Sequence, residues 1–97
     1  MQIAIVIGSV WSTRKEESLV GRKLLIIKPI NILDESVDNQ PIVAVDTIGA
    51  GVGETVLVVS GSSARVAAKD DQTPTDAAIV GIVDDKEVDK RYTGAGG

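Results

Sequence analysis

Five short apolar runs, each bounded by turn-forming residues, constrain the fold of this 97-residue chain more than any other feature. All of them are rich in Val and Ile, whose branched side chains suit the pleated surface of a strand. The runs are residues 3–11, 23–32, 41–45, 55–60 and 77–83. Residues 64–69 alone look helical, with Ser62 or Ser63 as the expected N-cap. The sequence therefore predicts an all-β fold, a small barrel or sandwich, for which a five-stranded OB-like β-barrel with one short helix is the natural candidate.

The chain has room for one small domain and no second core. Acids, Ser and Asn fill residues 34–40, which predicts a hairpin-like return between the second and third runs. After Asp84 the sequence becomes charged and then glycine-rich. We therefore expect residues 1–84 to form a single β-barrel domain and residues 85–97 to form a tail, mobile or docked on a partner.

The apolar runs lack the alternation that a half-solvated strand shows. Residues 3–7, 24–27, 56–59 and 77–83 are apolar almost throughout. Both faces of such strands need cover, and no long helix is available to supply it. Because soluble monomers rarely expose a large apolar surface, the pattern predicts an obligate homo-oligomer.

Composition argues against several classes of function. The chain has no His and no Cys, so the two commonest catalytic and metal-binding side chains are missing. We expect no catalytic residue, no metal site and no cofactor. The net charge of −4 argues against a nucleic-acid partner. No apolar run approaches the roughly 20 residues of a membrane span, and no signal peptide is visible. The expected protein is a soluble intracellular building block.

The glycine-rich segment Gly49-Ala50-Gly51-Val52-Gly53 invites comparison with nucleotide-binding loops. The dinucleotide fingerprint needs a glycine three places after Gly51 and a helix behind it, whereas Glu54 and an apolar strand follow here. A tight turn that uses positive φ or close backbone approach explains the glycines better. Such a turn also suits the crowding of backbones around an axis where subunits meet.

Three other groups of residues have both a functional and a structural interpretation. The segment from Ser60 to Arg65 is typical of a helix cap, with a generic anion site at the helix start as the alternative. Trp11 suits packing or an interface better than base stacking, which needs several aromatic residues in a basic groove. Solvated strand ends and turn caps, rather than a metal site, are expected of the acids Asp46, Glu54, Asp76, Asp84 and Asp85.

Three separated motifs, in order, resemble the bacterial microcompartment vertex proteins of the EutN/CcmL family. The first is MQIAIVIGSVWST at residues 1–13, followed by GRKLLII at 21–27. The others are DTIGAGVGETVLVVSGSSAR at 46–65 and TPTDAAIVGIVD at 73–84, so the resemblance covers residues 1–84. Relatives often carry Trp where this chain has Thr55, and residues 31–40 and the tail follow no matching pattern.

The resemblance implies a structural shell protein rather than an enzyme. Members of the family form cyclic homopentamers that cap the fivefold vertices of an icosahedral shell tiled by hexameric shell proteins. The implied location is the microcompartment shell in the bacterial cytoplasm, without nucleic-acid or membrane partners. The sequence of residues 61–65 resembles the ethanolamine-type members of the family more than the carboxysomal members, so a catabolic metabolosome is the expected type of compartment.

Under this interpretation, one loop and one helix start are candidates for the axial opening or a subunit contact. The residues are Gly49, Ala50, Gly51, Gly53, Ser62, Ser63 and Arg65. Two alternatives remain: an OB-type module for single-stranded nucleic acid, and a non-catalytic accessory subunit of an enzyme complex. The sequence leaves open the compartment type and its cargo, the face that points to the lumen, whether the opening conducts metabolites, and the role of the tail.

Overall fold

The computed structural model consists of five strands and one short helix, as the sequence predicts. It describes residues 1–11, 21–34, 36, 40–68, 76–85, 87 and 91. The elements, in chain order, are β1 (Gln2–Val10), β2 (Lys23–Pro29), β3 (Ile42–Asp46), β4 (Thr55–Ser60), α1 (Ser62–Ala67) and β5 (Ala77–Ile82). Of the expected tail, the description covers only the exposed residues 85, 87 and 91, so most of that prediction lies outside it.

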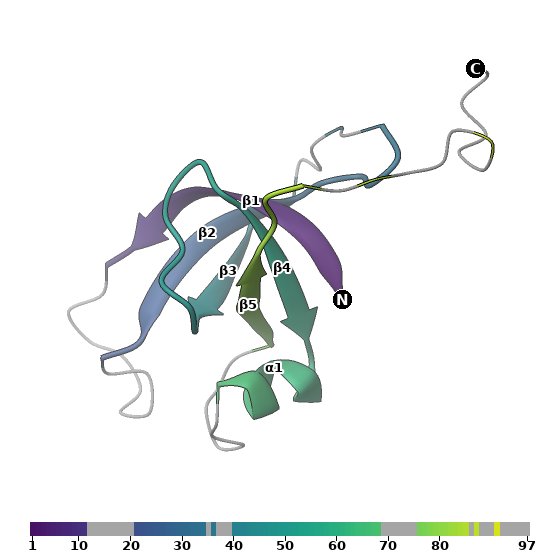
Figure 1. Cartoon of the computed structure of the whole chain (residues 1–97). Coiled ribbons are helices and arrows are strands. Elements are labelled where there is room, and N and C mark those ends of the chain that lie inside the picture. Colours follow the sequence, from purple (N-terminus) through teal and green to yellow (C-terminus); the bar gives the residue numbers. More distant parts are fainter. Residues whose placement is uncertain are drawn as a thin grey trace.

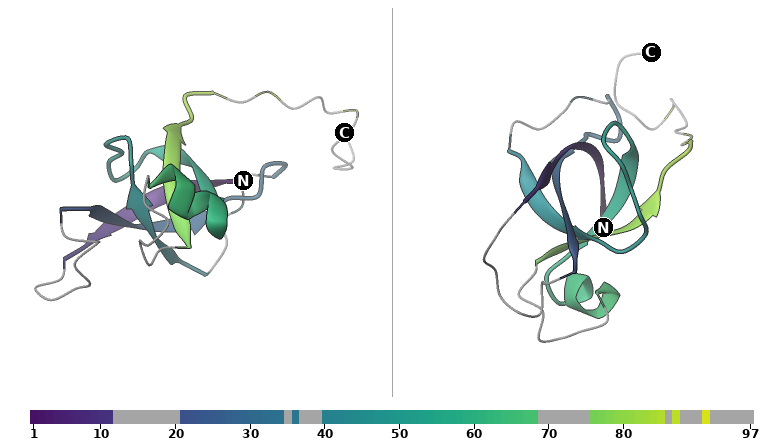
Figure 2. Two further views of the ribbon diagram at one scale, coloured as in Figure 1. Left: turned by 90° about the horizontal axis from the view of Figure 1, so that it is seen from below. Right: turned by 90° about the vertical axis from the view of Figure 1, so that its left-hand side faces the viewer.

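The strands close into a barrel in the order β1-β2-β3-β5-β4, with β4 returning to β1 (Figures 1 and 2). Four of the five pairings are antiparallel, and β3 pairs with β5 in parallel. The antiparallel pairing of β2 with β3 confirms the predicted return between these strands. The short β3–β5 pairing closes the barrel, and the predicted OB-like barrel is confirmed.

The second strand is shorter than its apolar run. It ends at Pro29, which has no N–H to continue the ladder, although Ile30 still donates to the Ile3 carbonyl at 2.9 Å. The side chain of Asn31 then accepts hydrogen bonds from the backbone N–H groups of Leu33 and Asp34 and forms a turn. Local turn chemistry therefore overrides the apolar character of residues 30–33.

The barrel interior is filled by small and medium aliphatic side chains. Burial alternates along the strands, so that every second residue of β1, β2 and β4 points inward. The cluster comprises Ala4, Val6, Leu25, Ile27, Ala44, Ala50, Val56, Val58, Ala77 and Ile79, each at most 3% exposed. These side chains pack the interior without any aromatic ring, which agrees with the scarcity of aromatic residues in the sequence.

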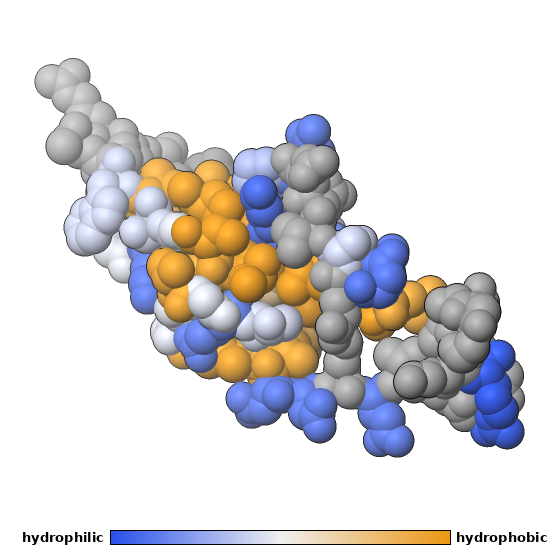
Figure 3. Space-filling model, turned by 90° about the horizontal axis from the view of Figure 1, so that it is seen from above, coloured by the Kyte–Doolittle hydropathy of each residue, from blue (hydrophilic) through white to orange (hydrophobic). Residues whose placement is uncertain are grey.

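The outward-pointing side chains of the same strands are also apolar. Ile7, Val43 and Ile82 are 42%, 47% and 39% exposed, and Ile26 lies opposite Val43 in the β2–β3 register. Figure 3 shows apolar surface gathered across one side of the barrel. The sequence prediction that both strand faces are apolar is correct, and in the single chain the outer face is partly exposed.

The helix covers one part of this outer face. It lies beneath the ends of β4 and β5 and packs against both strands (Figure 1). Its Ala64 and Ala68, which follows the last helical residue, are buried, as are Val45 and Ala78, which pair between β3 and β5. The short alanine side chains let the helix approach the barrel closely.

The start of the helix differs from the sequence prediction. The helix begins at Ser62, two residues earlier than expected, and its N-cap is Gly61, without a side-chain hydrogen bond. The N-cap prediction for Ser62 or Ser63 is therefore wrong. Gly61 has φ +62°, a conformation that glycine adopts without strain, and its N–H donates to the Asp76 carbonyl at 2.9 Å. The turn out of β4 thus fixes the helix start through glycine geometry rather than through a serine hydroxyl.

Candidate functional site

The glycine-rich segment forms the connection between β3 and β4. Gly49 and Gly53 have φ values of +83° and +93°, and no other atom lies near the position of a Cβ at either residue. The backbone conformation, not lack of space, therefore calls for glycine. The Glu54 carboxylate accepts from the Gly51 N–H at 2.6 Å, and the Glu54 N–H donates to the Gly51 carbonyl. The predicted tight turn is confirmed, and a strand rather than a helix follows it.

Backbone hydrogen bonds and one buried side chain attach this segment to the barrel. At one end, Gly53 donates to the Val6 carbonyl, and Val6 donates to the Glu54 carbonyl, both within 2.9 Å. In the middle, the Ala50 side chain is fully buried in the barrel core. The segment therefore connects β3 to β4, with the Ala50 side chain anchored in the core and its last residue hydrogen-bonded to β1 (Figure 1).

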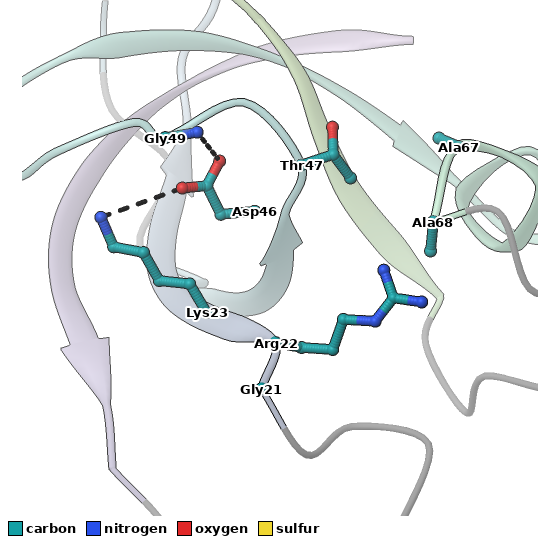
Figure 4. A pocket seen from close by; sticks show the side chains of 8 residues that line it. All are labelled: Gly21, Arg22, Lys23, Asp46, Thr47, Gly49, Ala67 and Ala68. Atoms are coloured by element: carbon teal, nitrogen blue, oxygen red, sulfur yellow. Dashed lines mark hydrogen bonds and ion pairs between the residues drawn. The ribbon is translucent and has the colours of Figure 1, made fainter.

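A pocket of about 440 Å³ lies where β2 begins, β3 ends and α1 ends. It is lined by Gly21, Arg22, Lys23, Asp46, Thr47, Gly49, Ala67 and Ala68 (Figure 4). The register of the sheet places Lys23 directly opposite Asp46. Of the residues that the sequence singles out, the pocket brings together only Gly49 and Asp46.

The Asp46 carboxylate is enclosed by its partners. Its side chain is 1% exposed, and its Oδ1 accepts from the N–H groups of Ile48 and Gly49 at 3.1 Å. The other oxygen lies 3.9 Å from the Lys23 Nζ, which also donates to the Ala50 carbonyl at 2.7 Å. The expected turn-capping role of Asp46 is confirmed, whereas its expected solvation is wrong.

Sequence patterns did not single out Arg22 and Lys23 as site residues. The available signal is the basic pair that stands directly before the second apolar run, at the open end of a strand. That signal becomes specific only when the register of the sheet is known, because Asp46 lies 23 residues further along the chain.

The helix residues proposed from the sequence lie apart from the glycine turn. Ser62 and Ser63 are exposed at the start of α1, and Arg65 is half-buried in its last turn. Trp11 directly follows β1 and is 92% exposed, so the described residues do not bury it, and the expected packing or interface role stays a prediction. Among the described residues, no three carboxylates lie close enough to hold a metal ion.

The fold and its surfaces define the class of protein: a small closed OB-like barrel whose strands are apolar on both sides. Residues 1–84 match the model of a family described as ethanolamine utilisation protein EutN/carboxysome. The chain belongs to this family.

Curated relatives come from two kinds of microcompartment. The shell vertex protein EutN of Salmonella typhimurium is 44% identical over 85 residues, which cover 88% of this chain and 85% of the relative. The carboxysome shell vertex protein CcmL of Gloeobacter violaceus is 43% identical over 95 residues, covering 94% and 90%. Among solved structures, the pentameric microcompartment shell protein GrpN of Rhodospirillum rubrum superposes with a TM-score of 0.82 at 46% identity, covering 91% and 99%. In the part of this chain that the structure describes, no helix has the length and apolar character needed to span a membrane.

Proposed function

We propose that this protein is a structural shell component that forms homopentamers at the fivefold vertices of a bacterial microcompartment in the cytoplasm. Its relatives are shell vertex proteins, and the similar GrpN structure is pentameric. In this role the protein performs no catalysis and needs no cofactor. Its partners are copies of itself and the hexameric proteins that tile the shell facets.

The apolar outer face of the barrel carries this proposal. Side chains such as Ile7, Val43 and Ile82 are each about 40% or more exposed in one chain, on strands whose other face already forms the core. Burying apolar surface between chains contributes about 25 cal/mol per Å², so neighbouring copies stabilise these side chains. A ring gives each chain two neighbours and covers two parts of its surface.

The glycine turn and the helix start are the proposed contact or axial residues. Gly49, Gly51 and Gly53 lie in an exposed or half-exposed turn, while the buried Ala50 holds that turn on the barrel. Ser62, Ser63 and Arg65 offer polar groups at the helix to a neighbour. We further propose that residues 1–84 are the assembling domain and that the tail after them is dispensable for the ring.

Native mass spectrometry tests the assembly directly. We expect one species of five chains for the full-length protein, and the same species for a variant truncated after Asp84. A stable monomer at micromolar concentration would contradict the proposal. The compartment type is a separate question, because the EutN and CcmL relatives are about equally similar to this chain. We favour a catabolic metabolosome.

Co-assembly tests the vertex role. Hexameric shell proteins should form closed particles when mixed with this protein and open sheets or tubes without it, as judged by electron microscopy. A nucleic-acid-binding module would instead retain single-stranded oligonucleotides at low salt, which we do not expect of this acidic chain. An accessory subunit would copurify with one enzyme at fixed stoichiometry and leave particle closure unchanged.

A further inference from the structure

The pocket between β2, β3 and α1 contains a cation, Arg22, to which the described residues provide no counter-ion. Within the described part of the chain, no hydrogen bond or ion pair engages the Arg22 guanidinium, although the side chain is half-buried. Figure 4 shows it extended across the pocket, toward the side where Thr47 and Ala68 lie. A guanidinium has five donors in a planar fork that matches the two oxygens of a carboxylate or phosphate group.

Among the described residues, the carboxylate that lines this pocket cannot serve Arg22. Asp46 is already engaged by two backbone N–H groups and by Lys23. Lys23 is in turn held toward Asp46 and the Ala50 carbonyl. The described charged residues that line the pocket are therefore two cations and one satisfied anion.

Small residues keep the space in front of Arg22 open. The other walls include Gly21, Gly49, Ala67 and Ala68. Positive φ values of +81° and +83° at the two glycines disfavour any larger side chain there. The volume of about 440 Å³ falls in the range of small-molecule sites, which is roughly 300–1,000 Å³.

The geometry points to an anion-binding site in which Arg22 binds the carboxylate or phosphate group of a small molecule. Lys23 and Asp46 act as the fixed wall of this site: their ion pair keeps the carboxylate from competing for Arg22. Gly49 lines this site and is also a proposed contact residue, so the inference rests on Arg22 remaining accessible in the proposed pentamer.

Titration of the ¹⁵N-labelled full-length protein tests this site. Inorganic phosphate and succinate are added separately at constant ionic strength, balanced with sodium chloride. We expect saturable shifts of the amide resonances of Gly21, Gly49 and Ala68 with at least one of the two probes. Succinate alone would identify a carboxylate ligand, and phosphate alone a phosphate ligand. Shifts that grow linearly without saturation for both probes would overturn the inference.

Variants identify the responsible side chain. Arg22→Gln should weaken the apparent affinity at least tenfold, and Arg22→Lys should weaken it less, because an ammonium retains the charge but not the fork. Lys28→Gln is the matched control, since it removes one positive charge from β2, the strand that directly follows Arg22, at a position outside the pocket. Equal affinity in all variants would overturn the inference. The inference would also be overturned if the wild type bound neither anion and the Arg22→Gln variant lost the five-chain species. Arg22 would then pair with a neighbouring chain.

Discussion

The inner and outer faces of the barrel use the same kinds of residue in different surroundings. Ile27 and Ile26 are neighbours on β2; Ile27 is completely buried, whereas Ile26 is only partly covered. The same contrast separates Ala44 from the 47%-exposed Val43 on β3. In most antiparallel barrels the outer position would be polar. The inner face therefore provides the core that folds one chain, and the outer face provides the surface that joins chains.

The largest expected effect on stability comes from comparing substitutions at two adjacent residues, one on each face of the barrel. Ile27→Ala should lower the free energy of unfolding by about 2–5 kcal/mol, because it leaves a cavity in a closed core. The defect should not depend on protein concentration. Ile26→Ala should cost less in the folded chain, and its effect should depend on concentration, because assembly stabilises folded chains by mass action. Urea denaturation at several protein concentrations measures both, and equal, concentration-independent losses would remove the distinction between the faces.

A charge on the outer face should weaken assembly more than it weakens the folding of the single chain. Val43→Lys places an ammonium at a position that is 47% exposed in one chain. We expect the proposed pentamer to dissociate at a concentration at least tenfold higher, with the circular dichroism spectrum unchanged. Val43→Ile is the apolar control. If the lysine variant assembles like the wild type by native mass spectrometry, Val43 lies outside the contact.

Substitutions in the glycine turn test whether this loop stabilises the single chain, as the inner face does, or joins chains, as the outer face does. Gly53→Ala should lower the free energy of unfolding by about 1 kcal/mol through backbone strain at φ +93°. Gly51→Ala, without a positive φ and with its Cβ 3.4 Å from the Glu54 carboxylate, should cost less. Thermal unfolding compares the two. A larger effect of Gly51→Ala, seen only in the assembled protein, would place this turn at a subunit contact.

The smallest expected effect belongs to neither face. Hydrogen bonds from the Ser36 side chain and backbone lower the pKa of the exposed Asp34 below its ordinary value of 3.8. The contribution to stability is therefore complete above pH 3.8 and is lost as the pH falls through the lowered pKa. Asp34→Asn should lower the unfolding midpoint slightly at neutral pH, where the contribution of the carboxylate is complete, and flatten its fall in acid. Midpoints of the variant and the wild type that differ equally at neutral pH and below the lowered pKa would contradict this linkage.

Local sequence patterns predicted most of the fold. They failed where contacts between distant residues, or an unusual backbone conformation, determine the structure. The strand β4 matches its predicted run, residues 55–60, at both ends, because its apolar residues are bounded by Glu54 and Gly61. The helix start was mispredicted because the positive φ of Gly61 replaces a serine cap. The Arg22 pocket was missed because it depends on the register that brings Lys23 to Asp46.

By itself, the sequence determined that the chain is a small β protein of the microcompartment vertex family, with strands apolar on both sides. These properties depend on residue types and their order, which local propensity and periodicity express directly. Only the tertiary structure decided which apolar side chains close the core and which remain on the surface. It also decided that the Asp46 side chain is buried beside Lys23, while Arg22 has no partner among the described residues. The physical reason is that strand register and barrel closure set the distances between residues far apart in the chain.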